Sequence, residues 1–193
     1  MKNHLLHTAI AVALMGVATP ALAQSVPAAT IAVVDLDKVT SQCNACRTAK
    51  AALTGQVNSL KARQTALAGP LETEGKAIQT AAAALGGKAP DAALQARAQA
   101  FETRRQAAAQ EIGRQEQQIQ RNQAYISQQI GVKLGPIYQQ VMQRRGANVM
   151  VEIGATLASG SALDVSNDVL AALNASLTSV QTTAPAQAAP QGR

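Results

Sequence analysis

Two cysteines, Cys43 and Cys46, are the residues of this chain whose type and spacing could support covalent chemistry. Their CxxC spacing beside an expected helix start matches thiol–disulfide motifs, in which the helix N-terminus lowers the thiol pKa. Redox chemistry of this kind also needs a thioredoxin-like βαβ context, which the sequence does not offer. A structural disulfide is the favoured interpretation, since residues three apart on a helix have a suitable Cα separation. Buried or intersubunit thiols and a redox function remain as alternatives.

Acid–base catalysis and metal binding have no set of residues to support them. The two histidines, His4 and His7, lie in a segment that we expect to be removed. Glu72 and Glu74 are two apart on an expected helix and therefore do not face each other. Two cysteines without a histidine in the mature chain cannot complete a zinc site. The sequence thus predicts a protein that is not an enzyme and that has no metal or other cofactor.

The first 23 residues have the pattern of a secretory signal peptide. Lys2 precedes an apolar run that reaches Val17, and Ala21-Leu22-Ala23 is a small-residue cleavage pattern. The run is too short to span a bilayer. We expect cleavage after Ala23 and export of a soluble protein to an oxidising compartment, where a disulfide would persist.

The elements that position the cysteines are two long helices. Apolar or small residues recur at alternating steps of four and three over residues 39–85 and again over 94–141. This is the spacing of a coiled-coil seam, and its phase slips by one residue after Ile126. The seam assigned in this way includes Lys50 and Arg105.

A reversal between the two series predicts an antiparallel hairpin. It would form an arm over residues 41–146, with its tip near 86–91, where glycines release one helix and a proline precedes the next. Pro70 and Pro136 each follow a glycine inside a helix, so each predicts a kink or a break. Antiparallel pairing places Pro70 opposite about Gln106.

The flanking residues 24–40 and 147–177 are expected to form a small β body. Asp37 is expected to cap the first arm helix, and Ser166 to cap a short helix near the C-terminus. Residues 178–193 are rich in Thr, Ala, Pro and Gln, a composition that predicts a disordered tail.

A body of about 50 residues buries too little surface to be stable alone, and its strands would have open edges. Association of several chains, with their strands closing one another's edges, is the physical remedy. The residues expected in this shared body are Val33, Val34, Val149, Val151 and Ile153.

Charge is distributed unevenly along the chain. Residues 41–146 hold 14 basic and 6 acidic side chains, a net charge of +8, whereas residues 24–40 together with 147–180 carry −4. A basic arm predicts an anionic partner, although a merely solvated coiled-coil face is an equal alternative. Nucleic acid is not expected, because the mature chain is exported and aromatic residues for stacking bases are nearly absent. The arginines expected to contact a client are Arg97, Arg104, Arg105, Arg114 and Arg121.

The order of strand, helical hairpin, strand and short helix resembles the Skp/OmpH family of periplasmic chaperones. The resemblance rests on Ile31–Asp35, on Ala98–Glu102 in the returning helix, and on Leu163–Ser166 before the last helix. It implies an α+β homotrimer, with an intersubunit β-barrel as its body and one coiled-coil tentacle from each chain.

The resemblance also implies a function. Family members hold unfolded outer-membrane proteins in the cavity between their tentacles, without ATP, and no family catalytic residue exists to carry over. Lipopolysaccharide or an anionic membrane surface would also suit a basic arm. The alternative function is a non-enzymatic envelope adaptor that docks through its hairpin tip. The tip offers no large anchor residue except Leu85, which favours the chaperone.

Overall fold

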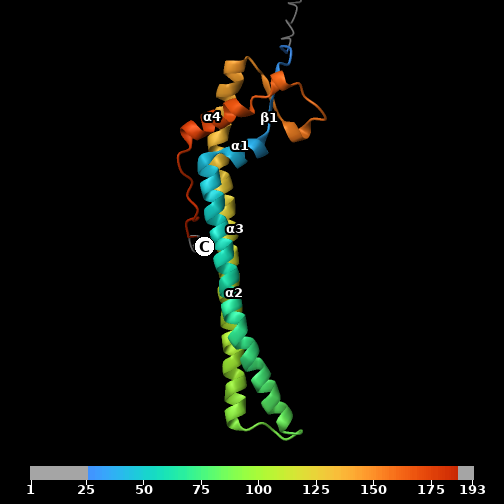
Figure 1. Cartoon of the computed structure of the whole chain (residues 1–193), viewed down its shortest axis with the longest axis vertical. Helices are drawn as coiled ribbons and strands as arrows, with labels where there is room; N and C mark the ends of the chain where they lie inside the picture. The colour runs from blue at the N-terminus through green and yellow to red at the C-terminus, as the bar shows by residue number, and fades with distance from the viewer. Residues whose placement is uncertain (1–25, 187–193) are drawn as a thin grey trace, which may run out of the picture.

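The computed structural model of the chain describes residues 26–186. A small body lies at one end and a long two-helix arm extends away from it (Figure 1). The signal peptide over residues 1–23 and its cleavage after Ala23 lie outside the described residues. Within residues 26–186 there is no helix with the length and apolar character needed to cross a membrane. The α+β class predicted from the sequence is confirmed.

Two short parallel strands form the sheet of the body. Strand β1 (Ile31–Val34) pairs with β2 (Val149–Glu152), so that Val33 lies beside Val151. On its other side β1 forms a parallel bridge with Asp164, where the Val165 N–H donates to the Val33 carbonyl at 2.9 Å. Strand β1 is therefore central, whereas no described segment pairs with the outer edge of β2.

The arm is joined to the body through a short helix and a sharp break. Helix α1 (Leu36–Gln42) is capped by Asp35, whose Oδ1 accepts the Lys38 N–H at 2.8 Å. The expectation that Asp37 is the cap is wrong, because Asp37 already lies in the first helical turn. Cys43 then has an extended backbone, and α2 (Asn44–Ala84) begins after it. The first arm helix is thus split at its root.

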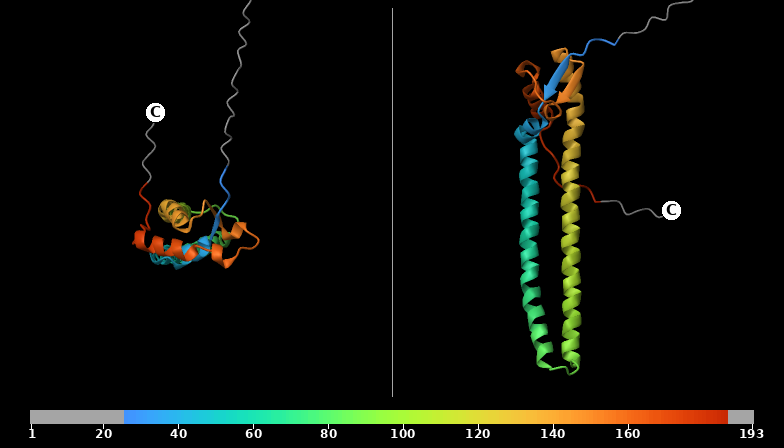
Figure 2. Two further views of the ribbon diagram at one scale, coloured as in Figure 1. Left: turned by 90° about the horizontal axis from the view of Figure 1, so that it is seen from above. Right: turned by 90° about the vertical axis from the view of Figure 1, so that its right-hand side faces the viewer.

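Helices α2 and α3 (Ala92–Arg145) lie antiparallel over the length of the arm (Figure 2). The tip lies where the sequence predicts it. Gly86 and Gly87 have φ of 55° and 89°, a left-handed backbone that favours glycine. Asp91 caps α3 by accepting the Leu94 N–H at 2.8 Å. The hairpin is therefore closed by standard turn and capping chemistry.

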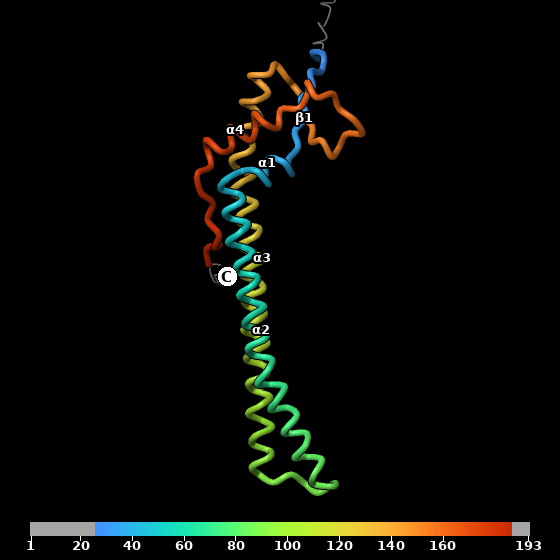
Figure 3. Tube along the Cα trace, in the orientation of Figure 1, coloured from blue at the N-terminus to red at the C-terminus, as the bar shows by residue number. Residues whose placement is uncertain are grey.

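Neither Gly-Pro pair breaks its helix. Pro70 lies inside α2 and Pro136 inside α3, and both helices continue past them. The part of α2 that follows Pro70 bends away from α3 in the views of Figures 1 and 3. Pro70 shares a cavity with Ala107 and Ala108, within two residues of the predicted Gln106. The predicted antiparallel pairing thus holds at this level of the arm.

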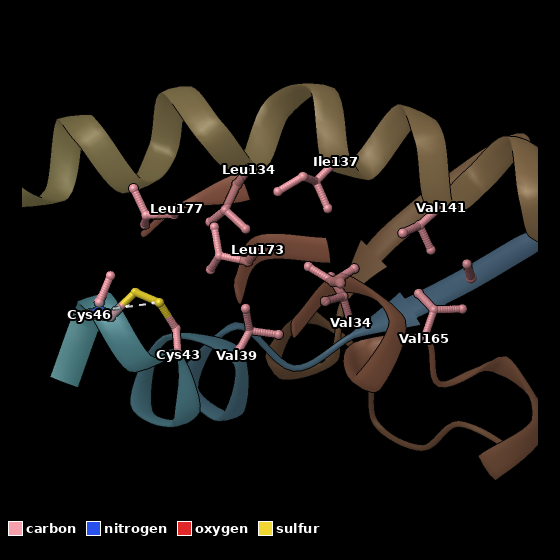
Figure 4. Packing of buried hydrophobic residues seen from close by; sticks show 13 residues of the cluster. Val34, Val39, Cys43, Cys46, Leu134, Ile137, Val141, Val165, Leu173 and Leu177 are labelled. Atoms are coloured by element: carbon pink, nitrogen blue, oxygen red, sulfur yellow. Dashed lines mark hydrogen bonds between the residues drawn. A yellow bond between two sulfur atoms is a disulfide. The ribbon is translucent and has the colours of Figure 1, made fainter. Parts of the chain in front are cut away.

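The apolar core joins the body to the root of the arm. Helix α4 (Ser166–Ser176) contributes the fully buried Leu173, which lies near Leu134 of α3 and Val39 of α1 (Figure 4). Val141 of α3 belongs to the same cluster, further along that helix. The arm predicted from the sequence spans residues 41–146, and this core contains residues from inside and outside that range. The chain stabilises its small body by burying it against the arm helices.

The start of α4 differs from expectation. Val165, not Ser166, occupies the capping position, and Ser166 is the first helical residue. Its hydroxyl accepts the Asp35 N–H at 2.8 Å and donates to Asp164. Hydrogen bonds from the Ser166 hydroxyl and N–H lower the pKa of the Asp164 carboxyl below its ordinary 3.8. Ser166 thus connects the loop after β1 to the start of α4.

Residues 178–186 of the expected disordered tail are ordered in the structure. They run from α4 along the arm, as the red segment beside α2 and α3 (Figures 1 and 2). Gln129 pairs with Gln181 through two hydrogen bonds of 2.9 and 3.0 Å, and Asn122 accepts the Ala184 N–H at 2.8 Å. The expectation of disorder from residue 178 is therefore wrong for residues 178–186.

Candidate functional site

Several large apolar residues of the body are exposed in the single chain. The loop from Ile153 to Asp164 projects from the body (Figure 1) and carries Leu157, which is fully exposed. Large exposed apolar residues on the strands and this loop form what we call the apolar rim: Ile31, Val149, Ile153, Leu157 and Leu163. Large apolar residues that a single chain leaves exposed are candidates for a contact surface.

The five residues expected in a shared body divide into two groups. Val33 and Val34 are 2% and 3% exposed within the single chain, so they belong to its own core. Val151 is half-buried, whereas Val149 and Ile153 are more than one-third exposed. Ile153 lies just beyond β2, in a short 3-10 helix (Ile153–Ala155), and not in a strand. Of the five, Val149 and Ile153 are the most available to another chain.

Cys43 and Cys46 form a disulfide, with their Cα atoms 5.2 Å apart. Both residues are buried in the shared core of body and arm (Figure 4). Cys43 also occupies the capping position of α2, and its sulfur accepts the Cys46 N–H at 3.2 Å. The geometry is that of a buried staple at the root of the arm.

The seam of the arm follows the predicted heptad with two exceptions. At the root, Ala49 is 1% exposed and lies inside, whereas the neighbouring Lys50 is exposed. On α3, Arg105 is also exposed and pairs with Glu102 at 2.8 Å on the same helix. Both long cations therefore lie outside the seam to which the heptad assigned them, as their charge requires.

A cavity of about 260 Å³ opens between the arm helices beside Pro70. Small and apolar side chains line most of it, including Leu67, Leu71 and Ala108, with Glu74 and Arg104 at its edge. The cavity lies at the level where α2 bends in Figure 1. The arm thus offers a shallow apolar hollow part of the way to its tip.

Three of the five arginines expected to bind a client are paired within the arm. Arg104 contacts Glu74 at 2.5 Å, Arg97 approaches Glu74 at 3.9 Å, and Arg105 pairs with Glu102. These pairs are largely exposed, so solvent screens them and they contribute little to stability. Their role is therefore local, and they reduce the charge that the arm presents to a partner.

The other two arginines have different surroundings. The Arg121 guanidinium donates to Gln118, and its Nε is buried without a partner among the described residues. Arg114 lies near Glu111, whose pKa is lowered mainly by a hydrogen bond from Arg63 at 2.6 Å. The five arginines therefore do not form one continuous basic surface.

The tip and the acidic side chains offer no further site. The tip from Leu85 to Asp91 includes none of the large exposed apolar residues of the described chain. Within residues 26–186, no group of three or more His, Cys, Asp or Glu residues lies close enough to hold a metal ion.

These features define a class of proteins in which a two-helix coiled-coil arm is inserted between the strands of a small β body. A family model described as outer membrane protein (OmpH-like) matches residues 30–173. The chain belongs to this OmpH-like family, and the Skp/OmpH resemblance is confirmed.

A solved structure supports the same fold. It is described as a candidate outer membrane chaperone (OmpH-like) from Caulobacter crescentus CB15, with a TM-score of 0.68 and 17% identity. The match covers 85% of this chain and 96% of that one. A search of curated proteins gave no match.

Two features of the structure were missed by sequence reasoning. One is the exposure of Leu157, which depends on where its loop projects. The other is a set of amide side chains that hold residues 178–186. Asn122 and Gln129 are one heptad apart, and amide residues at this spacing on a helix that is mostly apolar along its seam were the signal that could have indicated it.

Proposed function

We propose that this protein is a periplasmic, ATP-independent holdase that binds unfolded outer-membrane proteins between the arms of a homotrimer. The observation that carries the proposal is the free-standing arm. Beyond the root, the described parts of α2 and α3 pack only against each other and against residues 178–186 (Figure 2). Long surfaces on both helices are therefore available to a large client.

The trimer is supported by the surface of the body. The apolar rim would be buried by association, and the outer edge of β2 would gain a pairing partner. Burial of apolar surface and closure of strand edges both favour assembly. The body would then be the assembly site, with the arms pointing away from it.

The arm is suited to many weak contacts with clients of varied sequence. Its cavity beside Pro70 is shallow and apolar, and its small side chains set no narrow shape requirement. Its net charge of +8 favours an acidic client, and lipopolysaccharide or an anionic membrane surface falls in the same charge class. The adaptor alternative has no comparable support, because the tip lacks an exposed apolar anchor.

Client aggregation provides the test. An unfolded outer-membrane barrel protein is diluted from urea with and without the mature chain, in the absence of ATP, and light scattering is followed. We expect aggregation to be suppressed at one trimer per client. Unchanged scattering at this ratio would remove the proposal.

Stopped-flow capture at two salt concentrations tests the role of arm charge. Replacement by Gln of the five arginines at 97, 104, 105, 114 and 121 should slow association, because exposed charges attract over about 10 Å at 0.1 M salt. Glu74→Gln with Glu102→Gln is the matched control, since it breaks the same ion pairs and makes the arm more positive. Equal slowing by both variants would show that the ion pairs matter and the net charge does not.

A further inference from the structure

The C-terminal segment is held on the arm by four amide side chains, which we call the amide ladder: Gln56, Gln118, Asn122 and Gln129. Gln129 donates to the Gln181 carbonyl and accepts the Gln181 N–H, which is the two-point pairing that one strand residue makes with another. The hydrogen bonds between the ladder and the segment all use backbone atoms of the segment. The ladder therefore contacts polypeptide backbone and not the side chains of the segment.

The other contacts complete this recognition. Gln56 on α2 donates to the Thr182 carbonyl at 3.1 Å, and Asn122 on α3 accepts the Ala184 N–H at 2.8 Å. Asn122 is only 3% exposed and also donates to Gln56 at 2.8 Å, which fixes both amides in orientation. The ladder is thus anchored in the arm and joins both helices.

The segment and α3 run in opposite directions where the ladder joins them. Gln129 and Asn122 are seven residues apart, or about 10.5 Å along a helix. Gln181 and Ala184, which they bind, are three residues apart, with a bend at Thr183 between them. One heptad of α3 therefore spans three residues of an antiparallel segment. The next heptad position toward the tip is Gln115, which donates instead to Glu111 on the same helix at 3.2 Å.

We propose that the amide ladder is a binding site for the backbone of an unfolded polypeptide, and that residues 181–186 are its resident competitor. The inference deepens the proposed function, on which it rests for the identity of the natural client. An unfolded client offers the same backbone donors and acceptors as the C-terminal segment, whatever its sequence. Client binding at the ladder therefore requires the segment to leave.

The direct test uses a chain that ends at Val180, which keeps the apolar contact of that residue with the core. A peptide with the sequence of residues 178–186 is titrated into this chain, and the side-chain NH₂ resonances of Gln56, Asn122 and Gln129 are followed by NMR. We expect these resonances to shift. A peptide N-methylated at Gln181 and Ala184 lacks the two bonded N–H groups and should leave them unchanged.

A matched pair of variants separates the ladder from the helix surface. Gln129→Ala removes the two-point pairing, whereas Gln128→Ala alters an exposed neighbour that makes no side-chain hydrogen bond to residues 178–186. In the chain that ends at Val180, Gln129→Ala should weaken peptide binding severalfold and Gln128→Ala should not. Equal binding by both variants, or equal shifts with the N-methylated peptide, would overturn the ladder as a backbone site.

Capture of an unfolded outer-membrane barrel protein tests the competitor role. If the segment occupies the ladder about 90% of the time, the chain that ends at Val180 should bind the client about tenfold more tightly than the full mature chain. Equal affinities would overturn the competition. Peptide binding without capture of the barrel would remove the proposed function and keep the ladder, whereas capture without peptide binding would do the reverse.

Discussion

Replacement of Leu157 by Asp tests whether the body is the assembly site. Leu157 is fully exposed in the single chain, on a loop outside the core, so the change should leave the fold of the chain intact. In the proposed trimer its side chain would be buried at a subunit contact. A charge at Val33 is a poorer test, because Val33 is 2% exposed in the chain's own core and its replacement would unfold the subunit.

The size of the effect follows from burial. Burying one leucine side chain contributes about 1.5–3 kcal/mol, so three copies contribute about 5–9 kcal/mol to the trimer. A loss of about 5.5 kcal/mol lowers the association constant about ten-thousandfold. For a trimer, that constant varies with the inverse square of the protein concentration at which half of the chains are assembled. This concentration should therefore rise about a hundredfold. An unpaired carboxylate at the contact would raise it further.

Sedimentation velocity over a range of protein concentrations measures this shift. Val132→Asp is the matched control, because Val132 is also an exposed apolar residue but lies on α3, outside the apolar rim. Circular dichroism should show equal helix content in both variants. The reasoning would be refuted by a Leu157→Asp protein with the same mass distribution as the wild type, or by a wild type that stays monomeric throughout.

Three further outcomes test the fold. Leu173→Ala should lower the free energy of unfolding by about 2–5 kcal/mol in urea, because it opens a cavity in the core shared by body and arm; a loss below about 1 kcal/mol would contradict this. The depressed pKa of Asp164 supplies stability that is present above about pH 4 and is lost as the carboxyl protonates. Asp164→Asn should therefore reduce the fall in melting temperature below about pH 4. An identical fall in the variant and the wild type would exclude the Ser166 contact as its cause. Cys43→Ser with Cys46→Ala should cost about 2 kcal/mol by the loop-entropy estimate and should abolish the effect of a reductant on the melting temperature, with helix content unchanged.

The hairpin was predictable because its signals are local. A heptad, a pair of glycines and an aspartate cap each act within a few residues, and the structure places the tip between Leu85 and Asp91 as they indicate. The cap of the helix at the root was assigned to the wrong aspartate, because it depends on a contact that is not local. Asp35 and Asp37 are equally good caps by type, and the hydrogen bond that holds the Asp35 backbone comes from the distant Ser166, which no local pattern shows.

The candidate sites depended on contacts that no local pattern contains. The heptad assigned Arg105 to the seam, but its charge is satisfied outside by Glu102. The composition of residues 178–186 indicated disorder, because hydrogen bonds from side-chain amides to backbone leave no compositional trace in the segment that they bind. The parallel pairing of β1 with β2 likewise depends on how the arm returns to the body.

That pairing has a consequence for how the chain folds. Ile31 and Val149 are strand partners although 118 residues separate them, and the whole arm lies between. During N-to-C synthesis or export β1 emerges first, and its partner is absent until the arm has followed. Contacts between residues so far apart in sequence form slowly, whereas the helical hairpin needs only near neighbours. We therefore expect the arm to form first and to bring the two strands together, so that the nascent chain itself passes through a state with an unpaired, aggregation-prone β-strand.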